Sequence, residues 1–418
     1  YKRQVDAEEE EGPEETVTIE KHERKKTRNR SLPNNLPRTE VIHDLSDDEK
    51  QCECGCELKH IHDETSEQLD YIPAKVHVIK HIRRKYACPA CEETIITAKL
   101  PKQPIPKSIA TPGLLAHVLV SKYADHLPLY RQATILSRYN VDISRTTMAN
   151  WVIKCGELLA PLVQLMKREI LNYDIAYADE TSVQVLREPD KKATSKSYMW
   201  LFHGGPPDKH GFVYQYAPTR SQSVPLDFLD EYQGYLHVDG YQGYEPLFKK
   251  QKISCVACWA HARRKFIDVT KISKKPGVAH RVVKLIASLY AVEKEIKKKS
   301  LSPEQAKLVR NNKSAPILDN ILKYLTSTKP HVAPGSTLDK AFNYTLNHWS
   351  KLQTFLNDGR LEIDNNVTER AIKPFVIGRK NWLFANSVRG ADASAVIYSL
   401  IETCKFYDIE PYQYVRTV

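Results

Sequence analysis

The 418-residue chain has no apolar run of the roughly 18–20 residues needed to cross a bilayer, and no apolar core of a secretory signal. It also has no excess of acidic residues, since 62 Lys and Arg against 51 Asp and Glu leave a net charge of +11. We therefore expect a soluble, intracellular protein with no membrane partner, and its positive charge favours nucleic acid as a partner. The length predicts several domains. Because the first residue is Tyr rather than Met, we expect a fragment of a longer chain.

Cysteine is scarce and unevenly placed. A disulfide framework is out of character for a large intracellular chain, so clustered cysteines indicate metal ligands rather than free thiols. Residues 51–100 contain two such clusters, joined by a segment that alternates apolar and polar residues as strands do. This is the plan of a zinc ribbon, in which four thiolates hold a structural Zn²⁺. The predicted ligands are Cys52, Cys54, Cys88 and Cys91, with Cys56 as an alternative in the first cluster.

Residues 1–50 contain few large apolar side chains, and an acidic run in them is followed by a basic one. Such a segment cannot bury enough surface to fold alone. We interpret it as a disordered linker, with a basic arm along a DNA backbone as the alternative.

Residues 102–170 show apolar positions at helical spacing. A short break at residues 140–143 separates two helices, and Ser144 is placed to cap the second one. This outline is typical of a helix-turn-helix, whose second helix presents its first residues to the major groove. Arg145, Thr146 and Asn150 would then contact DNA, with Met148 packed behind them. An ordinary helical bundle that touches no DNA fits the same pattern.

Residues 172–272 carry the clearest order of elements: three strand-like segments, followed by strands that alternate with helices. Asp179 lies in the first strand segment, IAYADETSVQVL, and Asp239 lies at the end of the fourth, GYLHVDG. This is the order of the ribonuclease-H-like fold, in which the first and fourth strands are neighbours. We therefore predict an α/β core in which the two aspartates meet.

Helical sequence interrupts this pattern over residues 273–355 and predicts an all-α insertion. Residues 356–418 return to the core and end in a helix that packs against the sheet. Asp364, Asn365 and Asn366 are residue types that cap and open a helix, which places Glu369 in its first turn.

The predicted catalytic and metal-binding set is Asp179, Asp239 and Glu369. Carboxylate oxygens suit Mg²⁺ (or Mn²⁺), and two such ions can activate the nucleophile and stabilise the leaving oxygen in phosphodiester cleavage. Their placement in the order of strands and helices favours these three over other nearby carboxylates. The competitors are Glu180, Asp174, Glu245, Asp364 and Glu362.

Basic residues surround these positions and can hold DNA phosphates without reading sequence. Trp382 could stack on an unpaired base or belong to the core. Cys258 and His261 lie three apart on one helix face, where a second zinc site is one interpretation and a packing and hydrogen-bonding role is the one we favour. The basic set is Arg263, Arg264, Arg370, Lys373, Arg379 and Lys380.

Several blocks of the sequence resemble a known family. DETSVQVL, HVDGYQGYEPL, CWAHARRKF and DNNVTERAIKP, followed by GRKNWLFANS and YSLIET, look like the signature blocks of insertion-sequence transposases of the sixty-six family. The likeness runs from about residue 36 to the C-terminus, and the blocks keep the family's order. It implies a DDE recombinase with a ribonuclease-H-like core, a zinc-binding segment, a helix-turn-helix and a helical insertion before the Glu. The DDE residues carried over are Asp179, Asp239 and Glu369.

The resemblance implies metal-dependent nicking at transposon ends to free 3′-hydroxyls, which then attack target DNA. The implied partners are double-stranded DNA, further copies of the chain in the DNA complex, and helper proteins encoded by the element. The implied location is the bacterial cytoplasm, at the nucleoid when DNA is bound. Two other interpretations stay open: a catalytically silent zinc-ribbon and helix-turn-helix DNA-binding protein, and a structure-selective nuclease on the same core.

Overall fold

The computed structural model describes residues 38, 40–44, 46, 50, 60–66, 68, 76–87, 95–250, 252–272 and 276–418. The chain forms two units, Tyr1–Lys80 and His81–Val418, and the elements below all belong to the second. Most of the predicted N-terminal linker lies outside the described residues. So do the four predicted zinc ligands, Cys52, Cys54, Cys88 and Cys91, and the alternative Cys56.

A short hairpin opens the second unit, with β1 (Lys85–Ala87) antiparallel to β2 (Ile95–Thr97). The longer strands predicted between the cysteine clusters are wrong for residues 76–84, which form no strand. Their apolar side chains are exposed, with Val78 at 92% and Ile82 at 77%. Alternation specifies a strand only where a core covers one face, and within the described part of the chain these side chains are exposed.

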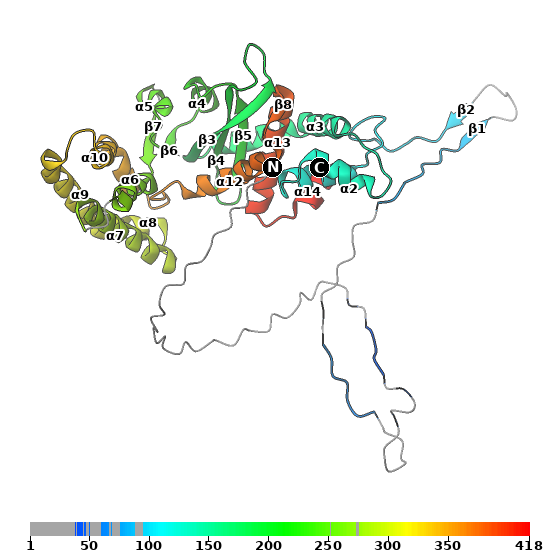
Figure 1. Cartoon of the computed structure of the whole chain (residues 1–418), viewed down its shortest axis with the longest axis horizontal. Helices are drawn as coiled ribbons and strands as arrows, with labels where there is room; N and C mark the ends of the chain where they lie inside the picture. The colour runs from blue at the N-terminus through cyan, green and yellow to red at the C-terminus, as the bar shows by residue number, and fades with distance from the viewer. Residues whose placement is uncertain are drawn as a thin grey trace, which may run out of the picture. The chain divides into compact units, whose positions relative to one another are not determined.

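The central sheet has the strand order β5-β4-β3-β6-β7 (Figure 1). The strands β3 (Ile175–Arg187), β4 (Lys196–Gly204) and β5 (Gly211–Ala217) are antiparallel neighbours. On the other side of β3, β6 (Gly234–Val238) and β7 (Ile253–Ala257) run parallel to it. The prediction that the first and fourth strands are adjacent is confirmed by the β3–β6 pairing. A three-residue strand that the sequence pattern missed, β8 (Ala385–Ser387), pairs with the far end of β3.

Helices from both ends of the second unit share one hydrophobic core with this sheet. They are α1 (Pro112–Tyr123), α2 (Leu129–Ser137), α3 (Arg145–Leu171), α13 (Val388–Phe406) and α14 (Pro411–Thr417). The helices α3 and α13 pack on each other and on β5. Ser144 caps α3 as predicted, because its hydroxyl accepts a hydrogen bond from the Thr147 amide.

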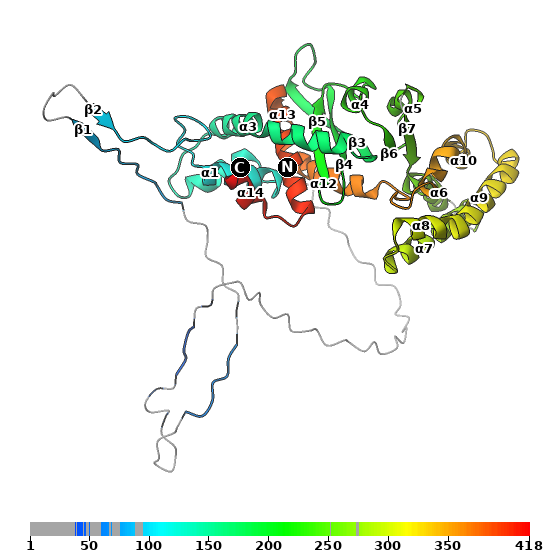
Figure 2. The same ribbon diagram turned by 180° about the vertical axis from the view of Figure 1, so that it is seen from behind.

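The helical character predicted for residues 273–355 is confirmed for the described part of that range, and Figure 2 shows these helices grouped beside α6 and away from α1–α3. It contains α7 (Val278–Lys298), α8 (Pro303–Val309), α9 (Ala315–Thr328), α10 (Thr337–Asn347) and α11 (Trp349–Gln353). All of these helices except α8 share a second hydrophobic cluster with α6 (Trp259–Ile272) and residues of β3, β6 and β7, while α8 packs against the end of α7 in a smaller cluster. Two short helices, α4 (Ser223–Phe228) and α5 (Glu245–Lys250), flank β6. No helix among the described residues is long and apolar enough to span a membrane.

The helix α12 (Asn366–Trp382) packs against β3 and carries Glu369 in its first turn, as predicted. The helix begins at Asn366, as the residue types at 364–366 predicted, but the Asn365 side chain makes no cap hydrogen bond to the helix backbone. Its amide nitrogen instead donates to the Ala178 carbonyl at 3.3 Å and so ties the helix to β3. The carboxylate of Asp364 accepts from the Asn366 amide at 3.1 Å and takes over the role at the helix start.

Candidate active site

The β3–β6 register brings the two predicted aspartates together. Tyr177 on β3 lies opposite His237 on β6, and the pairing keeps a constant offset of 60 residues (237 − 177). Asp179 and Asp239 have the same offset (239 − 179), so continuing the register sets Asp239, just after β6, beside Asp179. The Asp179 carboxylate accepts from the Glu180 amide at 2.8 Å, and that of Asp239 accepts from the Tyr241 amide at 2.9 Å.

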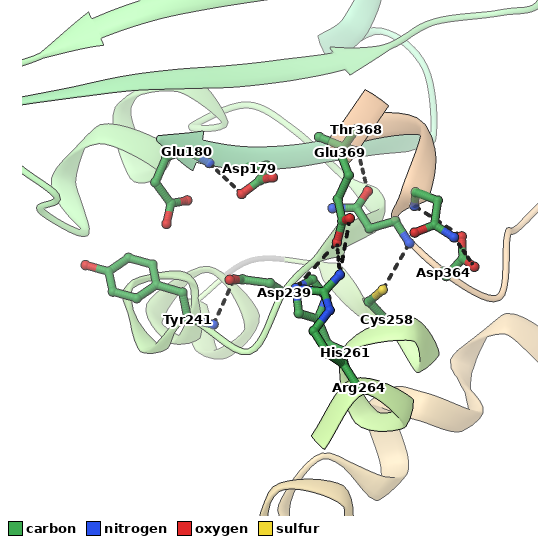
Figure 3. Close-up of polar contacts among 12 residues, drawn as sticks. Asp179, Glu180, Asp239, Tyr241, Cys258, His261, Arg264, Asp364, Thr368 and Glu369 are labelled. Carbon is green, nitrogen blue, oxygen red and sulfur yellow. Dashed lines mark hydrogen bonds and ion pairs between the residues drawn. The ribbon is translucent and has the colours of Figure 1, made fainter. Parts of the chain in front are cut away.

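Glu369 reaches the same region from α12. Figure 3 shows Asp179, Asp239 and Glu369 in one region, carried by three different elements, with the Glu369 carboxylate directed to Arg264. The Glu369 carboxylate accepts from Arg264 at 3.2 and 3.3 Å, and the Nε2 atom of His261 lies 3.6 Å from it. Both partners belong to α6, so this helix and α12 meet at the third carboxylate.

The electrostatic environment distinguishes Asp179 from an ordinary carboxylate. The pKa of Asp179 is raised to about 7, mainly by burial and then by the charges of Glu180, Asp239 and Glu369, while the hydrogen bond from the Glu180 amide opposes the rise. A carboxylate that is hard to ionise because other carboxylates face it gains most from a bound cation.

The competing carboxylates are each held by another side chain. Glu369 is also paired, with Arg264, so what distinguishes the predicted triad is its position where β3, the end of β6 and α12 meet. The pairs are Glu180 with Arg220, Asp174 with Arg360, Glu245 with Lys351, Glu362 with Lys297, and Asp364 with Tyr290.

A chain of buried hydrogen bonds holds the start of α12 next to Glu369. The sequence analysis did not predict this chain. The hydroxyl of Thr368 donates to the Asn365 side chain and lies 2.7 Å from Nε2 of His203, a fully buried residue of β4. Burial holds the pKa of His203 well below its usual value, so the ring is neutral. Its Nδ1 atom lies 3.0 Å from His210, and Tyr177 stacks on its face at 4.5 Å. His203 and Thr368 are 165 residues apart, and no local pattern signals the contact.

A family model described as "Transposase IS66 family" matches residues 107–393, and one described as the zinc-finger binding domain of transposase IS66 matches residues 49–92. The chain belongs to the IS66 transposase family. The resemblance seen in its sequence blocks is therefore confirmed, and the chain carries a zinc-finger domain followed by a transposase domain.

Curated relatives of this IS66-family chain come from Sinorhizobium fredii and are uncharacterised proteins. The protein y4jD is 35% identical over 401 residues, which cover 93% of this chain and 77% of that protein. The protein y4hP is 30% identical over 425 residues, which cover 96% of this chain and 75% of that protein.

The basic residues predicted to bind DNA in this transposase divide into two groups. Arg379 is turned inward, because its guanidinium donates to the Thr181 hydroxyl at 3.1 Å and to the backbone carbonyl of Ser182. It fixes α12 against β3, so its predicted contact with DNA does not fit this position. The other predicted DNA-binding side chains are at least partly exposed: Arg145, Thr146, Asn150, Arg263, Arg264, Arg370, Lys373 and Lys380.

The two supporting residues, Cys258 just before α6 and His261 on it, have distinct surroundings. Cys258 is buried, and its sulfur accepts from the Asn365 amide at 3.2 Å, which supports the hydrogen-bonding role. Burial lowers the pKa of His261, although the Glu369 charge opposes this effect. Trp382 packs edge-on against Phe375, with ring centroids 5.5 Å apart, which favours the core interpretation over base stacking.

The donor chemistry of the site fits a hard divalent cation. Asp179, Asp239 and Glu369 supply oxygen atoms, which Mg²⁺ prefers. As the side chains lie, no three His, Cys, Asp or Glu of the described residues are arranged to enclose an ion. Glu369 points to Arg264, so it has to turn from that guanidinium to join the aspartates.

Proposed function

We propose that this IS66-family protein is a DDE transposase that cleaves transposon ends and joins them to target DNA. The observation that carries the proposal is the convergence of Asp179, Asp239 and Glu369 from β3, the end of β6 and α12, while the competing carboxylates pair elsewhere. Two aspartates on neighbouring parallel strands and a glutamate from the adjoining helix suit a site that binds divalent ions.

The topology supports a ribonuclease-H-like core. Three antiparallel strands, followed by two parallel strands on the other side of the first, are the arrangement predicted for that fold. We assign residues 172–272 and 356–418 to this core and residues 273–355 to the all-α insertion.

The upstream regions suit DNA recognition. The pair α2 and α3, with exposed Arg145, Thr146 and Asn150 at the start of α3, supports a helix-turn-helix within residues 102–170. We propose a zinc ribbon over residues 51–100 with Cys52, Cys54, Cys88 and Cys91 as ligands and Cys56 as the alternative in the first cluster, and a linker over residues 1–50. The match to the zinc-finger family over residues 49–92 supports this ribbon.

The proposed reaction has two steps, cleavage at the transposon end and joining to target DNA. A water oxygen attacks the scissile phosphorus and the bond to the 3′ oxygen breaks, which leaves a 3′-hydroxyl. That hydroxyl then attacks a phosphorus of target DNA and displaces a target 3′ oxygen. Mg²⁺ or Mn²⁺ held by Asp179, Asp239 and Glu369 would activate the attacking oxygen and neutralise the leaving one. Arg264 holds Glu369 until DNA and metal arrive, and it then offers its charge to a phosphate.

The proposed partners are the two transposon ends, target DNA and further copies of the chain, with helper proteins from the same element. The net charge of +11 supports binding to DNA in the cytoplasm and at the nucleoid.

The test is a paired assay on labelled duplexes that carry the ends of the encoding element, with Mg²⁺ present. Wild type should cleave and join, whereas Asp239→Asn should lose at least about 100-fold of both rates because it removes a ligand charge from the proposed metal site. Binding to the duplex should persist. The control is Asp174→Asn, which removes an acid that pairs with Arg360 outside the triad and should keep the wild-type rate.

The outcomes separate the alternatives. Cleavage without joining favours the structure-selective nuclease, and tight binding without cleavage in wild type favours the silent DNA-binding protein. If Asp239→Asn cuts as fast as wild type, the assigned site is wrong.

A further inference from the structure

A pocket of about 420 Å³ lies beside Asp239, and its lining is cationic and aromatic. Asp239 and Gly240 line it from the segment after β6. Arg220 lines it from the segment between β5 and α4, and Lys265 lines it from α6. Sequence reasoning assigned no role to either cation.

Each of the two cations is held over a tyrosine ring that also lines the pocket. The guanidinium of Arg220 lies 3.8 Å from the ring centroid of Tyr241, and Nζ of Lys265 lies 4.5 Å from that of Tyr344. A cation over an aromatic face is stabilised by the ring without losing its charge. The Arg220 guanidinium and the Lys265 ammonium therefore present positive charge in the pocket next to Asp239.

Arg220 is also held from behind. Its Nε atom donates to the Glu180 carboxylate at 2.7 Å, and that carboxylate accepts from the Tyr244 hydroxyl at 2.7 Å through its other oxygen. The Glu180 side chain is 1% exposed, whereas the Arg220 side chain is 40% exposed. The hydroxyl of Tyr241 donates to the Arg220 carbonyl. The buried Glu180 carboxylate therefore fixes the Arg220 guanidinium, whose solvent-facing side remains open to a ligand.

We propose that Arg220 and Lys265 bind a DNA phosphate adjacent to the one that reacts. Two cations suit a phosphate, and the volume of the pocket holds a sugar–phosphate unit. Because Asp239 lines the same pocket, a strand bound there has its next phosphate at the triad. Glu180 acts as a positioning residue for Arg220. This inference rests on the proposed DNA-cleaving function.

The experiment measures binding to element-end duplexes that carry a single neutral methylphosphonate, moved one position at a time across the cleavage site. Ca²⁺ replaces Mg²⁺ so that binding is measured without cleavage. In wild type, one position next to the cleaved bond should weaken binding about tenfold, because it loses the contact with the two cations. Arg220→Gln should bind the unmodified duplex about tenfold more weakly and show no further loss at that position.

The salt dependence gives an independent readout. Arg220→Gln and Lys265→Gln should each lower the slope of log affinity against log salt by about one, as expected for one lost phosphate contact. Arg220→Lys should keep the wild-type slope because it keeps the charge. Matched controls are Arg389→Gln, an exposed partner of Glu157, and Lys271→Gln, an exposed lysine of the same helix α6. Both controls should bind as wild type does.

The inference is overturned if Arg220→Gln keeps the wild-type slope of affinity against salt and the wild-type methylphosphonate pattern. It is also overturned if no methylphosphonate position affects wild type and Arg220→Gln differently. A wild type that binds no duplex overturns it as well. If those results come with cleavage that depends on Asp239, only this inference fails. If cleavage is unaffected by Asp239→Asn, the proposed function fails whatever the methylphosphonate pattern shows.

Discussion

Asp179 occupies a position where ionisation is costly. Its folded pKa of about 7 lies above the usual 3.8 because burial, and then the neighbouring carboxylates, disfavour the charged form. The folded state therefore holds this proton more tightly than the unfolded chain does. The associated stability is present below about pH 4 and is lost as the pH rises through about 7. Above that pH the fold carries an unfavourable charge that a bound cation would neutralise.

Asp179→Asn should consequently stabilise the metal-free protein at pH 8. The expected gain is about 1–3 kcal/mol, less than the full pKa shift implies because the site is partly exposed. At pH 5 the gain should largely vanish, since the wild-type carboxyl is then protonated. Thermal unfolding in EDTA at both pH values measures the difference, with Asp174→Asn as a control that should show no such gain. An equal effect of Asp179→Asn at both pH values would contradict the assignment.

At the scale of elements, the start of α12 is fixed by side chains rather than by an ordinary cap. Asn365 ties the helix to β3 through the Ala178 carbonyl, and Thr368 ties it to β4 through His203. Because Thr368 directly precedes Glu369, the orientation of the third carboxylate depends on both strands. The polar groups involved are buried, so losing one partner leaves another unsatisfied.

Thr368→Val should destabilise the protein by about 1–3 kcal/mol, because it leaves His203 and Asn365 without their shared hydroxyl. Cleavage should slow while DNA binding stays unchanged, since Glu369 is misplaced but the basic surface is intact. Urea unfolding and single-turnover cleavage measure the two effects. Thr368→Ser keeps the hydroxyl and should have nearly wild-type stability and cleavage rate. If Thr368→Val cleaves as fast as Thr368→Ser, the hydroxyl contact does not position Glu369.

At the scale of the whole second unit, the insertion is anchored to the chain that leads into α12. Arg310 is 3% exposed and donates to both carboxylate oxygens of Glu293 on α7, at 2.9 and 2.8 Å. It also donates to the carbonyls of Phe355, Asp358 and Leu361. These three residues precede the helix that carries Glu369, so one buried guanidinium links the insertion to the candidate site.

Arg310→Met should cost about 3–5 kcal/mol, because it leaves the Glu293 carboxylate buried without a partner. The double variant Arg310→Met/Glu293→Leu should recover part of this loss but not all of it, since three carbonyls stay unpaired. Urea unfolding of both single variants and the double variant measures the coupling. Additive losses would show that the pair does not interact as the geometry indicates.

The local sequence determined much of this protein. Alternation along residues 175–187, the Ser144 cap and the helical spacing of residues 278–347 all gave the correct element types, because neighbouring residues decide them. The order of strands also allowed the meeting of Asp179 and Asp239 to be predicted, and the β3–β6 register agrees. Where no core covers the alternating residues 76–84, the same rule failed.

Only the tertiary structure decided which polar groups serve the site. Arg379 has the sequence context of a DNA contact, but its guanidinium bonds to β3. Asn365 has the sequence context of a helix cap, but its side chain bonds to the Ala178 carbonyl. Arg220 and Lys265 line the same pocket as Asp239 although nothing in their own segments marks them. The physical reason is that a polar side chain's role depends on which partner burial brings within hydrogen-bonding distance, and these partners lie far away along the chain.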